Sequence, residues 1–221
     1  MKVLSTKKLN ESQKNLLGDL ELKEIPFISI SYGEDFKVEE TILNAVFTSA
    51  NSVRSVFKKH AVDTKWFDTV FCVGQKTKKL LEENGIAVEI CANNALDLAD
   101  ILAEKFSSND DELNEISWFC GNLRNNDLPT ILAENGVVVT EYLVYQTKLT
   151  PVEIKEDFDA VLFFSPSGVK SYLKKNKVNS KPVICIGSTT ATEAIESFEN
   201  VYIAEETSVE STIDKVKEVL L

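Results

Sequence analysis

The sequence predicts an α/β protein built from two similar parallel-sheet domains. Short apolar runs rich in Val, Ile and Phe alternate with amphipathic stretches, the order expected when helices cover both faces of a parallel sheet. Related segments also recur along the chain. Its 221 residues, of which 43% are hydrophobic, suffice for two small cores. We therefore expect one type of domain to occur twice.

Ten strands are predicted in chain order. They are residues 2–5, 23–31, 45–48, 69–73, 87–90, 116–120, 137–145, 160–164, 183–186 and 201–203. Helices are predicted between them, and two of these helices end at the Asn-Gly pairs that contain Gly85 and Gly136. Glycine can take the left-handed conformation that ends a helix. The polar segment 107–114 is predicted to form an acidic loop.

An internal repeat supports the doubled domain. Residues 72–77 resemble residues 185–190 at an offset of 113 (185 minus 72), and residues 46–57 resemble residues 162–173. A weaker match relates residues 3–31 to 118–146, so the chain has the pattern A-B-A-B. Long strands near 25–36 and 138–150 would join the two domains. The prediction places a cleft between them, where small ligands commonly bind.

Composition argues against several classes of partner. The net charge of −11, from 24 basic and 35 acidic residues, opposes binding to nucleic acid or to an anionic membrane. The N-terminus lacks the apolar run of a signal peptide, and no stretch approaches the roughly 20 apolar residues of a membrane helix. We expect a cytoplasmic protein.

The sequence offers little material for a metal site or a bound cofactor. Its four cysteines, which lack any C-x-x-C pair, are Cys72, Cys91, Cys120 and Cys185. They are interpreted as reduced core residues. The single histidine, His60, is expected on the surface at a helix C-terminus. No segment fits the glycine-rich patterns for dinucleotides or nucleoside triphosphates, so no cofactor and no metal are predicted.

Four turns of small polar residues follow predicted strands. Their candidate binding residues are Thr48, Ser49, Lys76, Thr77, Ser165, Ser167, Gly168, Ser188, Thr189 and Thr190. Such turns lie at the carboxyl ends of parallel strands, where the free N–H groups of the next helix favour anions. Any one of these turns, taken alone, is better interpreted as a simple helix cap. Repetition of the turns in both domains favours ligand binding.

Two further residues are candidates for the site. Asn122 lies in a polar loop that begins directly after the predicted strand 116–120. Tyr145 ends another strand, where alternation places it on the same face as Leu143. Its side chain could pack in the core or present a hydroxyl at the edge of the cleft.

Six segments together resemble one enzyme family. They are Phe47-Thr-Ser49, Cys120-Gly-Asn-Leu-Arg124, Val144-Tyr-Gln-Thr147, Phe163-Phe-Ser-Pro-Ser-Gly168, Ile186-Gly-Ser-Thr-Thr190 and Ala204-Glu-Glu-Thr-Ser208. In this order, and over nearly the whole chain, they resemble the uroporphyrinogen-III synthases. The resemblance implies two flavodoxin-like domains joined by a two-stranded ladder. One domain would comprise residues 1–33 and 148–221, and the other residues 34–147.

The resemblance also implies a reaction. The substrate would be hydroxymethylbilane, a linear tetrapyrrole of haem biosynthesis, which loses its terminal hydroxyl and closes with inversion of ring D. The enzyme would be a cofactor-independent lyase. Tyr145 matches a tyrosine that the family places in the cleft, where a phenol could donate a proton to the departing hydroxyl. Ser165, Ser167, Thr189 and Thr190 match its carboxylate-binding turns.

A noncatalytic two-lobed sensor of small anions is the alternative. The absence of an export signal and the Val144-Tyr-Gln-Thr147 segment argue against it. As an enzyme, the protein is expected to be a monomer that takes its tetrapyrrole from the preceding pathway enzyme.

Overall fold

The computed structural model describes residues 1–33, 38, 40–107, 114–178 and 180–221. Their contacts divide the chain into two compact units. Unit 1 contains Met1–Ser29 and Lys148–Leu221, and unit 2 contains Ile30–Thr147. The chain thus enters unit 2 earlier than the expected boundary after residue 33.

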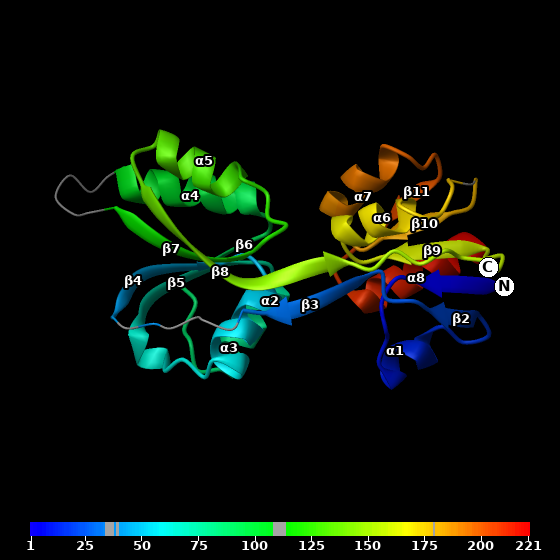
Figure 1. The fold of residues 1–221 in the computed structure, drawn as a ribbon, viewed down its shortest axis with the longest axis horizontal. Helices are drawn as coiled ribbons and strands as arrows, with labels where there is room; N and C mark the ends of the chain where they lie inside the picture. The colour runs from blue at the N-terminus through cyan, green and yellow to red at the C-terminus, as the bar shows by residue number, and fades with distance from the viewer. Residues whose placement is uncertain (34–37, 39, 108–113, 179) are drawn as a thin grey trace. The chain divides into compact units, whose positions relative to one another are not determined.

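Unit 1 is a five-stranded parallel sheet between two layers of helices (Figure 1). Its strands lie in the order β11-β10-β9-β1-β2. They are β1 (Lys2–Ser5), β2 (Glu21–Glu24), β9 (Ala160–Phe163), β10 (Val183–Cys185) and β11 (Val201–Ile203). Helices α6 (Pro166–Leu173) and α7 (Ser188–Ile195) cover one face. Helices α1 (Glu11–Leu16) and α8 (Val209–Leu220) lie on the other.

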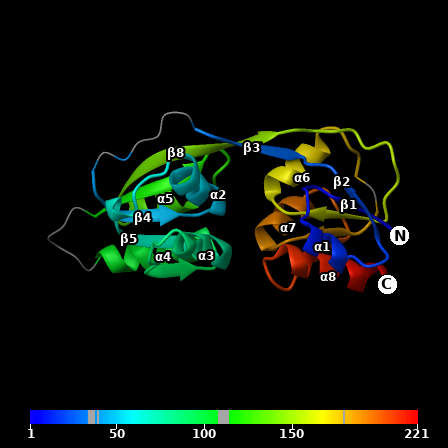
Figure 2. The same cartoon turned by 90° about the horizontal axis from the view of Figure 1, so that it is seen from below.

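Unit 2 repeats this arrangement (Figure 2). Its sheet has the order β3-β8-β7-β4-β5-β6. The strands are β3 (Ile28–Tyr32), β4 (Ile42–Phe47), β5 (Phe67–Val73), β6 (Ile90–Ala92), β7 (Glu115–Gly121) and β8 (Val138–Leu149). One face is covered by α2 (Ala50–Val53), the π-helix η1 (Arg54–Lys59) and α3 (Gln75–Glu83), and the 3₁₀ turn η2 (Thr64–Trp66) precedes β5. The other face is covered by α4 (Ala95–Ser107) and α5 (Asp127–Glu134).

The two sheets have the same spatial order, which confirms the predicted α/β fold. Read from β6 to β8, unit 2 has strands β6-β5-β4-β7-β8, which correspond to β11-β10-β9-β1-β2 of unit 1. When the five strands of unit 1 are numbered in chain order, their spatial order is the flavodoxin-like order 2-1-3-4-5 read backwards. The A-B-A-B repeat explains the correspondence, because unit 1 combines the first A with the second B.

Strands β3 and β8 form the predicted two-stranded ladder. The Gly33 amide donates to the Val144 carbonyl at 3.2 Å, and the Thr150 amide donates to the Phe27 carbonyl at 2.9 Å. Phe27 pairs with Thr150 and the later residue Gly33 pairs with the earlier residue Val144, so the two segments run antiparallel. Both strands carry the chain between the units.

Two strand predictions are wrong in detail. The single strand 23–31 is divided into β2 and β3 around Pro26, which has no amide hydrogen to donate to a ladder. Strand 87–90 is replaced by β6 at Ile90–Ala92. The two Asn-Gly predictions hold, since Gly85 and Gly136 end helices with φ of 82° and 77°. Residues 34–36 of a predicted long strand and residues 108–113 of the acidic loop lie outside the described residues.

The cysteines are placed largely as predicted, whereas the prediction for the histidine is only partly correct. All four cysteines are free; Cys72, Cys120 and Cys185 are buried, whereas Cys91 is half-buried. His60 directly follows η1 but is half-buried rather than on the surface.

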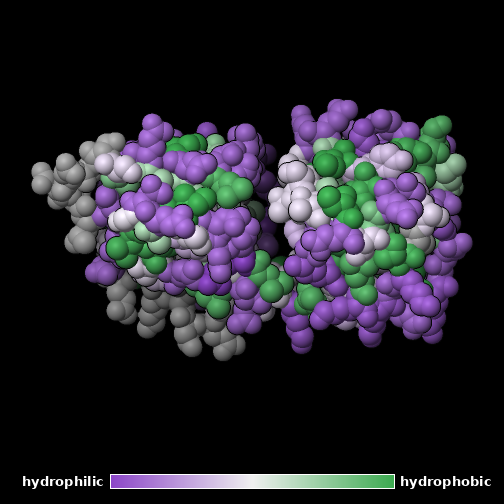
Figure 3. Space-filling model, turned by 90° about the horizontal axis from the view of Figure 1, so that it is seen from above, coloured by the Kyte–Doolittle hydropathy of each residue, from purple (hydrophilic) through white to green (hydrophobic). Residues whose placement is uncertain are grey.

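The surface mixes charged residues with separate apolar patches. Figure 3 shows this mixture on one face of the molecule, where hydrophobic patches interrupt a largely hydrophilic surface on both units. No helix in the described part of the chain is long and apolar enough to cross a membrane.

Candidate functional site

Each sheet has a switch point, where the connections leave neighbouring strands in opposite directions. It lies between β4 and β7 in unit 2 and between β9 and β1 in unit 1. Open α/β sheets bind ligands at the carboxyl ends of the strands at such points. The predicted turns 48–51 and 165–168 begin there, after β4 and β9.

Thr48 and Ser49 are fixed by hydrogen bonds within unit 2. The Trp118 indole N–H of β7 donates to the Thr48 hydroxyl at 3.1 Å. Ser49 is the N-cap of α2, and its hydroxyl accepts from the Asn51 amide at 3.1 Å. The capping interpretation is therefore correct for Ser49. The same hydroxyl is a neighbour of the Tyr145 phenol and lowers its pKa.

Tyr145 reaches this point through a bulge in β8. Pairing with β7 runs without a break from Glu115–Val138 to Cys120–Leu143, and then Gly121 pairs with Tyr145 instead of Val144. The expectation that Leu143 and Tyr145 share a face is therefore wrong. Val144 and Tyr145 both pack on the side of α2 and α3, whereas Leu143 is half exposed.

The Tyr145 phenol is protonated at physiological pH, as a phenol of ordinary pKa would be. Burial raises the pKa of Tyr145 above its ordinary value, and the neighbouring Ser49 hydroxyl opposes part of that rise. The group is therefore a neutral proton donor at physiological pH.

Asn122 extends the pairing of β7 and β8 beyond the bulge. Its side-chain amide donates to the Thr147 carbonyl at 3.2 Å, and its side-chain oxygen accepts from the Thr147 amide at 2.7 Å. These two bonds imitate a strand ladder. Asn122 therefore has a structural role, although its side chain is exposed.

The nearby cations have partners of their own. Arg124 lies over the Trp118 ring, 5.7 Å from its centroid, and pairs with Glu141. Lys170 pairs with Glu193 at 3.1 Å. Lys76 is exposed in the first turn of α3. Because Arg124 and Lys170 are each paired with a glutamate, they offer an anionic ligand little free positive charge.

The switch point of unit 1 gathers hydroxyl groups. The Ser165 hydroxyl caps α6 by accepting from the Gly168 amide at 3.1 Å, and it lies 3.1 Å from the Ser167 hydroxyl. Thr6, which follows β1, donates to the Leu162 carbonyl at 2.7 Å on the neighbouring strand. Thr6 is only 4% exposed, so its hydroxyl joins β1 to β9 and does not face a ligand.

In the turns that follow β5 and β10, exposed side chains lie next to buried ones. Ser188 and Thr189 are exposed at the start of α7, whereas Thr190 is only 3% exposed. Its repeat equivalent, Thr77, is 4% exposed. The side chains of Thr77 and Thr190 are therefore withdrawn from any ligand. Thr207, after β11, lies beside Gly187 and joins the exposed turn.

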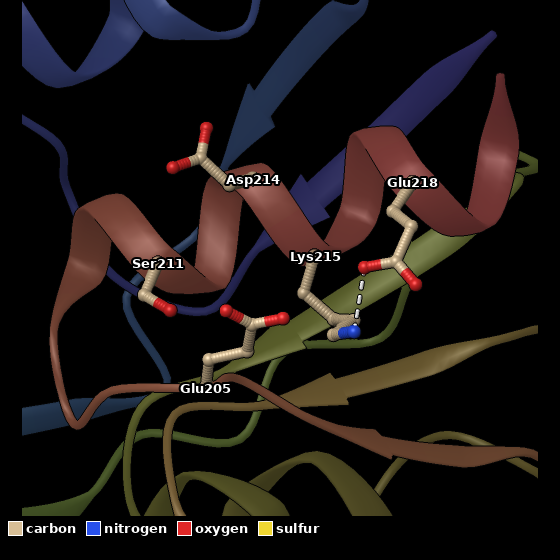
Figure 4. A pocket seen from close by; sticks show the side chains of 5 residues that line it. All are labelled: Glu205, Ser211, Asp214, Lys215 and Glu218. Atoms are coloured by element: carbon tan, nitrogen blue, oxygen red, sulfur yellow. Dashed lines mark hydrogen bonds and ion pairs between the residues drawn. The ribbon is translucent and has the colours of Figure 1, made fainter.

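A shallow hollow on unit 1 is lined by other residues. Figure 4 shows them around α8: Glu205, Ser211, Asp214, Lys215 and Glu218. The only cation among them, Lys215, is paired with Glu218 at 2.6 Å. Three carboxylates against one ammonium group make the hollow unsuited to an anion.

The described residues contain no group of three or more His, Cys, Asp or Glu side chains placed to hold a metal ion. Unit 2 contributes the protonated phenol of Tyr145 near the hydroxyls of Thr48 and Ser49. Unit 1 contributes the hydroxyl-bearing residues at the starts of α6 and α7. Such groups can donate hydrogen bonds to anions and a proton to a leaving group.

Comparison with known proteins identifies the family. Residues 18–214 match the family model described as uroporphyrinogen-III synthase HemD. The fold is similar to that of the uroporphyrinogen-III synthetase of Helicobacter pylori, with 18% identity, 99% of each chain covered and a TM-score of 0.69. It is also similar to a mutant uroporphyrinogen III synthase of the extremely thermophilic bacterium Thermus thermophilus, with 16% identity, 100% and 98% covered and a TM-score of 0.71. Because the family model spans most of its length, the chain belongs to the uroporphyrinogen-III synthase family.

Proposed function

We propose that the chain converts hydroxymethylbilane to uroporphyrinogen III, closing the linear tetrapyrrole with loss of water and inversion of ring D. The observation that carries this proposal is the phenol of Tyr145, held neutral beside Ser49 at the switch point of a chain that belongs to this family. The reaction makes it a lyase, and it needs no electron carrier because no group is oxidised or reduced.

Tyr145 is proposed as the proton donor. Its phenol would protonate the terminal hydroxyl, which leaves as water, and the opposite end of the chain would then close on the cation through a spiro intermediate. A positioned donor of this kind typically contributes 10²–10⁴-fold to a rate. The proton is present at physiological pH, as it would be at the ordinary pKa of a phenol, and what supports the role is the position of the hydroxyl beside the switch point.

The polar turns are proposed to hold the carboxylates of the substrate. Thr48, Ser165, Ser167, Ser188 and Thr189 place small hydroxyls next to helix starts, and Lys76 adds a charge at the start of α3. Thr77 and Thr190 contribute through the packing of these turns rather than through their buried hydroxyls. Holding a flexible chain in one conformation lowers a barrier by several kcal/mol, roughly 7–11 in the best intramolecular cases.

We further propose that the protein works in the cytoplasm as a monomer and takes hydroxymethylbilane directly from the enzyme that makes it. Direct transfer suits a substrate that closes unaided to the unwanted isomer. Equal activity per mole at nanomolar and micromolar protein would support the monomer.

A product assay tests the function. Freshly prepared hydroxymethylbilane is supplied to the protein, and the type III and type I isomers are resolved. Predominantly type III product supports the proposal. Type I product at the uncatalysed rate, together with measurable binding of the substrate, would instead support the noncatalytic sensor.

A further inference from the structure

We infer that Gly121 is a positioning residue for the Tyr145 phenol, because the ring occupies the space that any larger residue at position 121 would fill. This inference rests on the proposed role of Tyr145 as the proton donor, and it names what sets the direction of that donor.

The first observation is the closeness of the ring to Gly121. A Cβ atom added to Gly121 would lie 2.5 Å from Cε2 and 2.8 Å from the phenolic oxygen of Tyr145. Carbon atoms in good contact are about 3.5–4.0 Å apart. The tip of the Tyr145 ring therefore occupies the place where a side chain at position 121 would begin, and alanine at this position would displace it.

The second observation is that the backbone does not require a glycine here. The glycines with left-handed φ are Gly18, Gly74, Gly85 and Gly136, and Gly121 is not one of them. An ordinary residue could adopt its conformation. The neighbouring ring is thus the feature of the structure that calls for glycine.

The third observation is that two other features aim the phenol at the same place. The bulge in β8 pairs Tyr145 with Gly121, whereas continuous pairing would have placed Val144 there. The Ser49 hydroxyl, at the start of α2, is close enough to the phenol to lower its pKa. Gly121 supplies the space, the bulge supplies the direction, and Ser49 is the polar neighbour of the phenolic oxygen.

A double-mutant cycle on the full chain tests the inference. The rate of type III product formation is measured for the wild type, Gly121→Ala, Tyr145→Phe and the double variant. Gly121→Ala is expected to lower the rate about tenfold or more, since small misplacements of a reacting group are costly. In the Tyr145→Phe background the same change is expected to cost less than about twofold, because no donor remains to be misplaced. Equal losses in both backgrounds would overturn the inference.

Two structural measurements complete the test. The Cζ resonance of Tyr145 in tyrosine-labelled protein is assigned by its absence from Tyr145→Phe, and it is expected to shift in position and titration midpoint in Gly121→Ala. Gly33→Ala is the control, because a Cβ there would have its nearest neighbours at 3.7 Å, an ordinary contact. An unmoved resonance in Gly121→Ala would also overturn the inference.

If Gly121→Ala folds poorly, the free energies of unfolding of Tyr145→Ala and of the double variant test whether the Tyr145 ring causes the defect. Removing the ring should then relieve the clash, so Gly121→Ala combined with Tyr145→Ala should be no less stable than Tyr145→Ala alone. A double variant that is markedly less stable would overturn the inference. If Tyr145→Phe proves fully active, the proposed proton donor is wrong, while the resonance and the stability still show whether Gly121 sets the ring position.

Discussion

Neighbouring residues of one turn can differ completely in what they offer a ligand. Thr189 and Thr190 both begin α7, but only Thr189 presents its side chain to solvent. We expect Thr189→Tyr to lower the rate of type III product formation about tenfold or more, with an unchanged Tm, because bulk there blocks the approach to the helix start. Thr190→Tyr should instead destabilise unit 1 by about 1–3 kcal/mol through overpacking. Rates and thermal unfolding separate the two effects.

Two variants serve as controls for this prediction. Thr192→Tyr adds the same bulk to an exposed position further along α7 and should leave the rate unchanged. Lys170→Ala should change it less than about twofold, because that ammonium group is already paired with Glu193. The prediction fails if either control lowers the rate as much as Thr189→Tyr.

At the scale of residues, the sequence indicates which side chains lie near the site better than it indicates their roles. The turn containing Ser49 and the loop after Cys120 were both predictable, because polar residues directly follow apolar strands. The withdrawal of Thr77 and Thr190 was not, since burial depends on packing between segments distant in sequence. The position of Tyr145 depends on a single extra residue in β8, which alternation alone does not reveal.

Among the elements, the junction of β7 and β8 depends on one side chain. Asn122→Ala removes both hydrogen bonds to the Thr147 backbone. We expect it to lower the free energy of unfolding by roughly 1–3 kcal/mol, at about 0.5–1.5 kcal/mol for each bond. Asn122→Asp keeps the oxygen that accepts from the Thr147 amide, so it should lose less. Urea unfolding measures both variants. If Asn122→Ala is fully stable but less active, Asn122 binds substrate, as the sequence predicted, and does not mainly stabilise the fold.

Buried thiols on the central strands make stability depend on pH. Burial raises the pKa of Cys72 and Cys185 to about 12 and that of Cys120 to about 11, from an ordinary value of 9.0, and a hydrogen bond that the Cys72 thiol donates to Cys91 contributes at Cys72. The folded-state values exceed the unfolded ones, so this stabilisation is complete below pH 9 and is lost as the pH rises towards 11–12. Each thiol contributes a slope of up to about 1.4 kcal/mol per pH unit.

Urea unfolding between pH 8 and pH 10.5 checks this expectation. Cys185→Ala is the informative comparison, because it removes one titrating thiol and should flatten the decline above pH 9. A slope equal to that of the wild type would mean that Cys185 ionises as freely in the folded protein as in the unfolded chain.

Most elements could be predicted because apolar runs and Asn-Gly pairs are local signals. Strands β1 and β11 have the predicted bounds, and the helices ending before Gly85 and Gly136 end as predicted. The division of residues 23–31 depends on different partners, since β2 pairs with β1 and β3 pairs with β8. A proline in an otherwise continuous run was the local sign of that division.

For the molecule as a whole, the repeat predicted more than periodicity could. The A-B-A-B pattern implies that each unit combines one A with one B, and the two sheets indeed have equivalent strand orders. The pattern does not say which A joins which B. Pairing between residues far apart in sequence decides that, as where Val3 of β1 pairs with Ala160 of β9.

Because of this connectivity, unit 2 is formed by one continuous segment of the chain, whereas unit 1 is formed by two separate segments. Unit 2 is continuous over Ile30–Thr147 and has cores on both faces of its sheet, so we expect a fragment of residues 30–147 to unfold cooperatively in urea. In a fragment of residues 1–147, the first 29 residues should remain unfolded, because β1 lacks β9 and the core partners of Leu4 and Phe27 in β9 and β10 are missing. Amide NMR spectra of the two fragments test both statements. Ordered resonances from residues 1–29 in the longer fragment, or a noncooperative transition of the shorter one, would show that the two units depend on each other for folding.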